Sequence, residues 1–164
     1  EDIQNVNAAY KKVGVEAELK TFFSHMSELL KKTHLVISRS GASTVAELAV
    51  VGRPAIFIPY PFAIDNHQQK NTTYLVEAGG AWCCEEKNIT PKVLANVISK
   101  VITDPDVYNK AVMASRNCGV PDAVERLAEL VLRIASETSR IRPASKIMLA
   151  NVLTLFLSFE MGGG

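Results

Sequence analysis

The sequence SRSGASTVAEL, residues 38–48, and the apolar residues 35–37 before it decide the fold. The apolar run is rich in β-branched residues and predicts a short strand, whereas Val45 and Leu48 recur at helical spacing. Gly41 lies between the two and permits close backbone approach in a tight turn. The stretch therefore predicts a strand that passes through a turn of small residues directly into a helix.

This predicted turn is suited to holding a phosphate group. The free N–H groups of a helix's first turn point out of the helix, and the macrodipole adds about +0.5 charge there. Ser40, Ser43 and Thr44 add hydroxyl donors. A serine at this place can equally cap the helix without binding any ligand. The stretch by itself leaves both interpretations open.

Further strand and helix signals alternate along the chain. Apolar runs predict strands at residues 55–58 and 81–85, and a loosely alternating pattern predicts another at residues 15–23. Continuous apolar runs suit a parallel sheet that is covered on both faces. Helices are predicted over residues 1–12 and 24–32, from the quoted turn to Gly52, through residues 68–76, over 91–101, from 105 onward, and over 121–135. The alternation predicts an α/β fold with a Rossmann-like, doubly wound parallel sheet.

Length, composition and charge narrow the class of protein. A chain of 164 residues suits one domain or one half of a two-domain enzyme. With 48% hydrophobic and 21% charged residues, the composition is that of a globular protein. The net charge is +1, from 18 basic and 17 acidic residues, which gives no general attraction to nucleic acid. Any anion must therefore be bound locally.

The cysteines indicate the redox compartment. Cys83, Cys84 and Cys118 form no C-x-x-C pair, and their odd number argues against a disulfide framework. This usage indicates a reducing cytoplasm. The adjacent Cys83 and Cys84 suit packing in the core, and no metal site is predicted.

The end of the sequence is predicted to be separate from the globular domain. We expect residues 1–139 to form that domain and residues 140–164 to form an apolar extension. The run at residues 147–159 is almost wholly apolar, but its 13 residues fall short of the ~20 that a spanning helix needs. Two interpretations stay open: a segment lying on anionic lipid beside Lys146 and its flanking arginines, or a helix packed on a partner domain.

Three predicted loops qualify as a ligand site. In an open parallel sheet, ligands bind beyond the carboxyl ends of the strands. Residues 22–23 offer an aromatic surface for a planar base, residues 39–44 offer phosphate donors, and residues 59–71 offer side chains that suit hydroxyl groups. The side chains of the third loop are those of Asp65, Asn66, His67, Gln68 and Asn71.

Three charged or titratable residues have two interpretations each. Glu47 lies about five residues into its helix, roughly 8 Å from the phosphate end, where its carboxylate can accept from a ribose diol or simply face solvent. Arg39 can neutralise a phosphate or pair with an acid of the domain. His67 has no nucleophile or carboxylate partner that the sequence assigns, which favours binding or capping over catalysis.

Five ordered motifs carry a resemblance to a known family. They are SRSGASTVAEL at residues 38–48, GRPA at 52–55, IPYP at 58–61, DNHQQKN at 65–71 and LVEAGGA at 75–81. From about Phe22 to Ala135, the sequence resembles the C-terminal half of the MurG family, the UDP-N-acetylglucosamine:lipid-linked muramyl-pentapeptide N-acetylglucosaminyltransferases of peptidoglycan synthesis. The resemblance implies the nucleotide-sugar-binding half of a two-domain glycosyltransferase of the GT-B architecture.

The resemblance also implies a donor site for UDP-N-acetylglucosamine (UDP-GlcNAc). Glu47 is expected to hold the ribose hydroxyls, and Phe23 is expected to lie beside the uracil. The diphosphate is expected to lie over the turn, and the sugar hydroxyls against the start of the following helix. The turn residues implied are Ser40, Gly41, Ala42, Ser43 and Thr44, and the sugar-binding residues implied are His67, Gln68 and Asn71. Family members use no metal and no other cofactor for the transfer.

The reaction implied is an inverting transfer that converts lipid I to lipid II. The muramyl 4-hydroxyl of undecaprenyl-pyrophosphoryl-MurNAc-pentapeptide attacks the anomeric carbon, and UDP leaves. In the family, the N-terminal domain carries the acceptor site and the presumed base, so no catalytic residue is expected in this chain, and no turnover by it alone. The expected location is peripheral, on the cytoplasmic face of the bacterial inner membrane.

Two other functions remain as alternatives. Residues 37–44 also resemble the serine- and threonine-rich phosphate loop of sugar-phosphate isomerases, although the segment at residues 65–71 has no role in that class. A donor-binding subunit that works with a separately encoded acceptor half, as in the two-subunit N-acetylglucosaminyltransferase of dolichol-linked sugar synthesis, is the second alternative.

Overall fold

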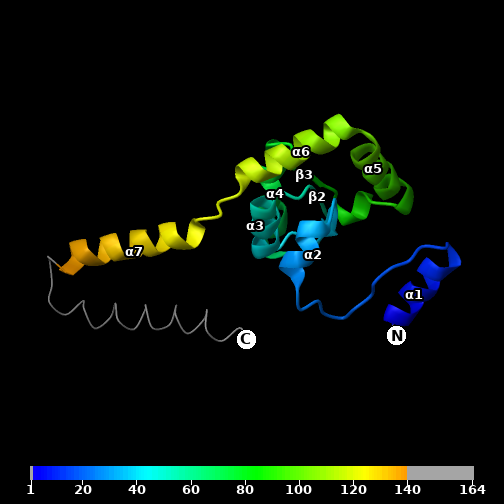
Figure 1. Ribbon diagram of the computed structural model, residues 1–164, viewed down its shortest axis with the longest axis horizontal. Helices are drawn as coiled ribbons and strands as arrows, with labels where there is room; N and C mark the ends of the chain where they lie inside the picture. The colour runs from blue at the N-terminus through cyan, green and yellow to red at the C-terminus, as the bar shows by residue number, and fades with distance from the viewer. Residues whose placement is uncertain (1, 140–164) are drawn as a thin grey trace. The chain divides into compact units, whose positions relative to one another are not determined.

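The computed structural model describes residues 2–139, which divide into two compact units between Gly119 and Val120 (Figure 1). The predicted extension at residues 140–164, including its apolar run at 147–159, lies outside the described residues. The first unit contains α1 (Asp2–Lys12), α2 (Met26–Lys32), β1 (Val36–Ser38), α3 (Ala42–Val51), β2 (Ala55–Phe57), the 3-10 turn η1 (Ile64–Asn66), α4 (His67–Glu77), β3 (Ala81–Cys83), the 3-10 turn η2 (Glu86–Asn88), α5 (Pro91–Thr103) and α6 (Pro105–Cys118). The second unit contains α7 (Ala123–Ser139).

The three strands form one parallel sheet in the order β1-β2-β3. Ile37 is paired with Ile56, and Ile56 with Trp82, while α3 and α4 connect the successive strands. The strands are shorter than predicted, although the Ile58 N–H still donates to the Ser38 carbonyl at 2.9 Å. The predicted parallel α/β sheet is confirmed. The three strands follow one another in order, so the change of order in a doubly wound sheet does not fall between them.

One face of the sheet packs against α3 and α4 to form the core. Leu48 and Ala49 of α3, Phe57 of β2 and Leu75 of α4 are all buried in one cluster. Burying a side chain of the size of leucine or phenylalanine contributes about 1.5–3 kcal/mol. This packing fixes the direction in which α3 leaves the end of β1.

Helix α6 packs closely against both α3 and α4 (Figure 1). Glycines permit this approach: a Cβ on Gly80 would lie 2.7 Å from the Ser115 backbone nitrogen, and one on Gly119 would lie 2.7 Å from the Ala49 carbonyl oxygen. The buried Ser115 hydroxyl lies 3.3 Å from the carbonyl oxygens of both Leu48 and Arg53, to which it can donate. Contacts from α6 therefore fix the position of the C-terminal end of α3.

Several predicted helix ends coincide with the observed caps. The Thr90 hydroxyl accepts from the Val93 N–H, and the Asp104 carboxylate accepts from the first turn of α6. A proline follows each cap at the first helical position, where its missing N–H has no cost. Gly52 ends α3 in the left-handed conformation, with φ of 69°.

The strand predicted at residues 15–23 is wrong. This segment has no regular secondary structure apart from a bend at Thr21, and none of the described strands pairs with it. A strand needs the backbone groups of a neighbour, and an alternating pattern of side chains does not supply them. The following helix begins at Met26 rather than at Ser24, with His25 at the N-cap position and no side-chain cap.

Within residues 2–139, no helix is both long enough and apolar enough to cross a membrane.

Candidate functional site

The N-terminus of α3 has no side-chain cap. Gly41 occupies the N-cap position with extended backbone, and its carbonyl accepts the first helical bond from the Val45 N–H at 3.0 Å. The N–H groups of the residues between them, Ala42, Ser43 and Thr44, precede this bond and have no acceptor within the helix. The interpretation in which a serine merely caps this helix is therefore wrong, and the amides stay available for an anion.

Two serine hydroxyls lie unpaired beside this turn. The side-chain oxygens of Ser38 and Ser40 are buried and have no hydrogen-bond partner among the described residues, and Ser40 is 0% exposed. Leaving a buried hydroxyl unpaired costs about 1–3 kcal/mol. Because native structures rarely leave such groups unpaired, the two hydroxyls single out this turn as a candidate site for an oxygen-rich ligand.

One of the predicted sugar-binding residues on α4, Asn71, contacts the turn. The Asn71 side-chain amide donates to the Ser40 carbonyl at 3.0 Å, which joins α4 to the turn. The Gln68 side-chain oxygen accepts from the Tyr60 backbone N–H at 2.9 Å. His67 opens α4 and is exposed. The structure therefore brings Asn71 directly to the turn, and Gln68 to the loop after β2.

The loop that leads into α4 is held in an unusual conformation. Asp65 and Asn66 have φ of 51° and 52°, in the left-handed region that aspartate and asparagine tolerate best among residues with a side chain. The two residues turn the chain sharply before His67. This turn sets where the first residues of α4 lie relative to the carboxyl ends of the strands.

Glu47 and Phe23 occupy different surroundings. Glu47 is exposed on α3, about one and a half helical turns after Ala42. Phe23 is half-buried before α2, with the Lys20 ammonium 5.4 Å from its ring centre, and lines a cavity of about 180 Å³. The Phe23 ring thus contacts Lys20 in the segment before α2, and its place beside a base stays a prediction.

Arg39 pairs with an acid of the domain, which is one of the two roles expected for it from the sequence. Its Nη1 atom lies 2.5 Å from Oε2 of Glu86, at the start of η2. The same nitrogen lies within hydrogen-bond distance of the carbonyls of Ile58 and Pro59, and the guanidinium carbon lies 5.8 Å from the Tyr60 ring centre. One side chain therefore spans the loops that follow all three strands.

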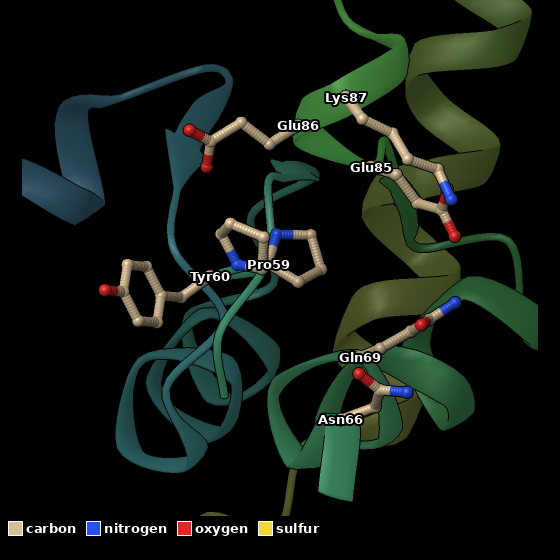
Figure 2. Close-up of a pocket in the computed structure, with 8 residues that line it drawn as sticks. Pro59, Tyr60, Asn66, Gln69, Glu85, Glu86 and Lys87 are labelled. Atoms are coloured by element: carbon tan, nitrogen blue, oxygen red, sulfur yellow. The ribbon is translucent and has the colours of Figure 1, made fainter. Parts of the chain in front are cut away.

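A cavity of about 230 Å³ lies between the loops after β2 and β3 (Figure 2). The carboxylate of Glu86 points away from Glu85 and Lys87, whose charged ends lie together at 3.0 Å (Figure 2). The cavity is lined by Pro59, Tyr60, Pro61, Asn66, Gln69, Glu85, Glu86 and Lys87. Sequence reasoning missed the residues after β3. The available signal was topological, because parallel strands bring their carboxyl ends to the same edge.

The described residues contain no group of three or more histidine, cysteine, aspartate or glutamate side chains placed to hold a metal ion. Burial raises the pKa of the Cys84 thiol, with a smaller contribution from Cys83. A raised thiol pKa disfavours the thiolate that metal ligation and nucleophilic chemistry need.

The fold and this edge define a class of protein. A parallel α/β sheet with an uncapped helix N-terminus at its carboxyl edge is typical of domains that bind phosphate-containing ligands. The model of the glycosyltransferase family 28 C-terminal domain matches residues 1–143, so the chain belongs to this family. The resemblance seen in its motifs is confirmed.

Two relatives and one solved structure specify the similarity. The chain is 47% identical over 147 residues to the UDP-N-acetylglucosamine–N-acetylmuramyl-(pentapeptide) pyrophosphoryl-undecaprenol N-acetylglucosamine transferase of Rhodospirillum rubrum, covering 90% of this chain and 38% of that protein. The transferase of the same name from Zymomonas mobilis is 47% identical over 134 residues, covering 82% and 35%. The crystal structure of Acinetobacter baumannii MurG matches with a TM-score of 0.74 and 26% identity, covering 81% of this chain and 40% of that one. The chain therefore spans well under half the length of these relatives.

Proposed function

We propose that this chain is the donor-binding half of an inverting glycosyltransferase. The enzyme moves N-acetylglucosamine from UDP-GlcNAc to the muramyl 4-hydroxyl of undecaprenyl-pyrophosphoryl-MurNAc-pentapeptide. The observation that carries the proposal is the uncapped N-terminus of α3 beside the buried, unpaired Ser40 hydroxyl. The names of the relatives supply the donor and the acceptor.

The turn at the start of α3 holds the donor diphosphate. The amides of Ala42, Ser43 and Thr44 face the phosphate oxygens, and Gly41 lets the backbone approach them closely. The Ser40 hydroxyl is buried in the ligand-free chain, so it donates to a further oxygen only when the turn shifts on binding. Because each of these groups is neutral, the positive end of the α3 dipole supplies the electrostatic attraction.

Other residues hold the nucleoside and the sugar. The Glu47 carboxylate accepts from the two ribose hydroxyls, a charge-assisted arrangement. Gln68, with His67 and Asn71 beside it on α4, binds the hydroxyls of the N-acetylglucosamine, and Phe23 packs beside the uracil. The hydrogen bond between Asn71 and Ser40 supports a site in which the sugar and phosphate parts are adjacent.

This half of the enzyme contributes to catalysis by stabilising the leaving group. As the acceptor oxygen forms its bond to the anomeric carbon, the bond from that carbon to the β-phosphate oxygen breaks, and negative charge develops on the departing UDP. Amide donors fixed at a helix N-terminus stabilise that charge. The proton of the attacking hydroxyl passes to a base outside this chain.

The remaining parts of the enzyme bind the acceptor and the membrane. The chain covers 38% of the Rhodospirillum rubrum transferase, which leaves room for an acceptor-binding domain elsewhere in the relative. A lipid-linked acceptor requires the enzyme to work at a bilayer surface, which supports a peripheral location on the cytoplasmic face of the inner membrane. We expect this chain alone to bind the donor without turning over the acceptor.

Thermal unfolding of the chain with and without ligand tests the proposal. UDP and UDP-GlcNAc are expected to raise the Tm, with a stabilisation of about 2.7 kcal/mol when the ligand is at about a hundred times its Kd. Protection by a hexose 6-phosphate without protection by UDP would favour the sugar-phosphate isomerase and overturn the proposal.

A pair of variants locates the binding. Ala42→Glu places a carboxylate at the start of α3, which favours the helix but repels a phosphate. Ala46→Glu places the same charge on an exposed position one turn later. Loss of UDP protection in the first variant but not in the second is expected. Equal behaviour of the two variants would remove the anion site from the α3 turn.

A further inference from the structure

Arg39 is placed to organise the edge of the sheet rather than to serve as a free charge. It lies immediately before Ser40, and its Nη1 atom lies 3.2 Å from the Ile58 carbonyl oxygen and 3.1 Å from that of Pro59. The Glu86 carboxylate accepts from the same nitrogen. The guanidinium charge is thus matched by a carboxylate, which weakens its attraction for a phosphate.

Arg39 bonds to residues 58–59, and the Gln68 side chain bonds to the next residue, Tyr60. The Tyr60 backbone N–H donates to the Gln68 side-chain oxygen at 2.9 Å, while the Tyr60 ring lies against the Arg39 guanidinium. Contacts therefore run from Glu86 through Arg39 and Tyr60 to Gln68. The chain of contacts links the loop after β3 to the first turn of α4.

The bond from Tyr60 fixes which end of the Gln68 amide faces the ligand. A backbone N–H can bond only to the side-chain oxygen, so the two N–H donors of Gln68 are left to point elsewhere. Sugar hydroxyl oxygens are natural acceptors for these donors. An amide that rotated freely would present its oxygen as often as its nitrogen.

We propose that Arg39, anchored by Glu86, is a positioning residue that fixes residues 58–60 and thereby directs the Gln68 amide donors at the sugar of the nucleotide-sugar donor. This inference rests on the proposed function, because it requires a sugar beside Gln68. Its distinctive consequence is selectivity: the network acts on the sugar of the ligand and leaves the diphosphate contact at the α3 turn intact.

Calorimetric titration of the chain with UDP and with UDP-GlcNAc tests the selectivity. Arg39→Met removes the anchor but keeps most of the side-chain length, and Glu86→Gln removes the opposite charge at an exposed position. Each variant is expected to weaken UDP-GlcNAc about tenfold while changing UDP less than about twofold. Glu85→Gln is the matched control, since Glu85 lines the same cavity but pairs with Lys87, and it should change neither affinity.

Two results of the titration would overturn the inference. If Arg39→Met weakened UDP as much as UDP-GlcNAc, Arg39 would bind the diphosphate that the two ligands share. If Glu86→Gln left both affinities unchanged, the anchor would have no role. Because Glu86→Gln is a nearly isosteric change at the surface, it keeps the test decisive even where Arg39→Met fails to fold.

Amide hydrogen exchange of the ligand-free chain separates this inference from the proposed function. The Tyr60 N–H should exchange faster in Arg39→Met and Glu86→Gln than in the wild type or in Glu85→Gln, because its acceptor becomes less well fixed. Unchanged exchange would overturn the positioning role whatever the ligand affinities are. A wild type that binds neither UDP nor UDP-GlcNAc would instead defeat the proposed function, and with it the sugar-directed part of this inference.

Discussion

The side-chain amide of Asn71 donates a hydrogen bond of 3.0 Å to the backbone carbonyl of Ser40. This bond joins the first turns of α4 to the turn that precedes α3, across 31 positions of sequence. It satisfies the carbonyl of Ser40 while the hydroxyl of the same residue stays unpaired and buried. The protein thus fixes the backbone of the turn and leaves the Ser40 hydroxyl without a partner among the described residues.

Asn71→Asp is expected to lower both the stability of the chain and its affinity for UDP. The change removes the donor and places a carboxylate against a carbonyl oxygen, which should lower the free energy of unfolding by about 1–3 kcal/mol. Urea unfolding and calorimetric titration measure the two effects. Asn66→Asp, at an exposed position in the preceding turn, is the control and should leave the stability nearly unchanged. A loss confined to UDP-GlcNAc, with normal stability, would show that Asn71 binds the sugar alone.

Ser40→Ala is expected to have opposite effects on stability and on binding. Removing a buried hydroxyl that has no partner should raise the unfolding free energy of the ligand-free chain by about 1 kcal/mol, whereas UDP binding should weaken by a similar amount. The same urea and titration experiments report both quantities. Ser43→Ala, at an exposed position, should not stabilise the ligand-free chain. If Ser40→Ala destabilised the ligand-free chain, its hydroxyl would have a structural partner instead.

The parts of the fold that could be predicted are those whose signals are local. Short apolar runs indicated the three strands, and Thr90 and Asp104 indicated two helix starts, because a cap and the helix it begins are neighbours in sequence. The segment at residues 15–23 shows the limit of such signals. Its alternation is typical of a strand, but pairing depends on a neighbour that local sequence does not specify.

The candidate site likewise has a part that could be predicted from the sequence and a part that could not. The turn before α3 was predictable because a strand, a glycine and a helix follow one another directly. The pairing of Arg39 with Glu86 joins residues 47 positions apart, and only the parallel order of the strands brings them together. The bond between Gln68 and Tyr60 could not be predicted either, because a side-chain oxygen that accepts from a backbone N–H leaves no pattern in the sequence.

Gly80→Ala is expected to destabilise the fold by overpacking. The added Cβ would lie 2.7 Å from the Ser115 backbone nitrogen, so β3 or α6 must shift, at a cost of about 1–3 kcal/mol. Urea unfolding measures this cost. Gly41→Ala is the control, because its Cβ would meet only the Thr44 side chain, at 3.8 Å, and its φ of −60° suits any residue. A loss for Gly80→Ala no larger than that for Gly41→Ala would mean that α6 moves away freely.

Glu47→Ala is expected to weaken UDP binding by about 1–3 kcal/mol, through loss of charge-assisted hydrogen bonds to the ribose. Removing the 2′-hydroxyl from the ligand gives a stricter measurement. The wild type should bind 2′-deoxy-UDP more weakly than UDP, and Glu47→Ala should bind the two almost equally, because the lost partner is the same. Glu77→Ala, which removes an exposed glutamate from α4, is the control and should retain the preference for UDP. If Glu47→Ala kept full affinity for UDP, Glu47 would be a solvent-facing helix residue with no part in the site.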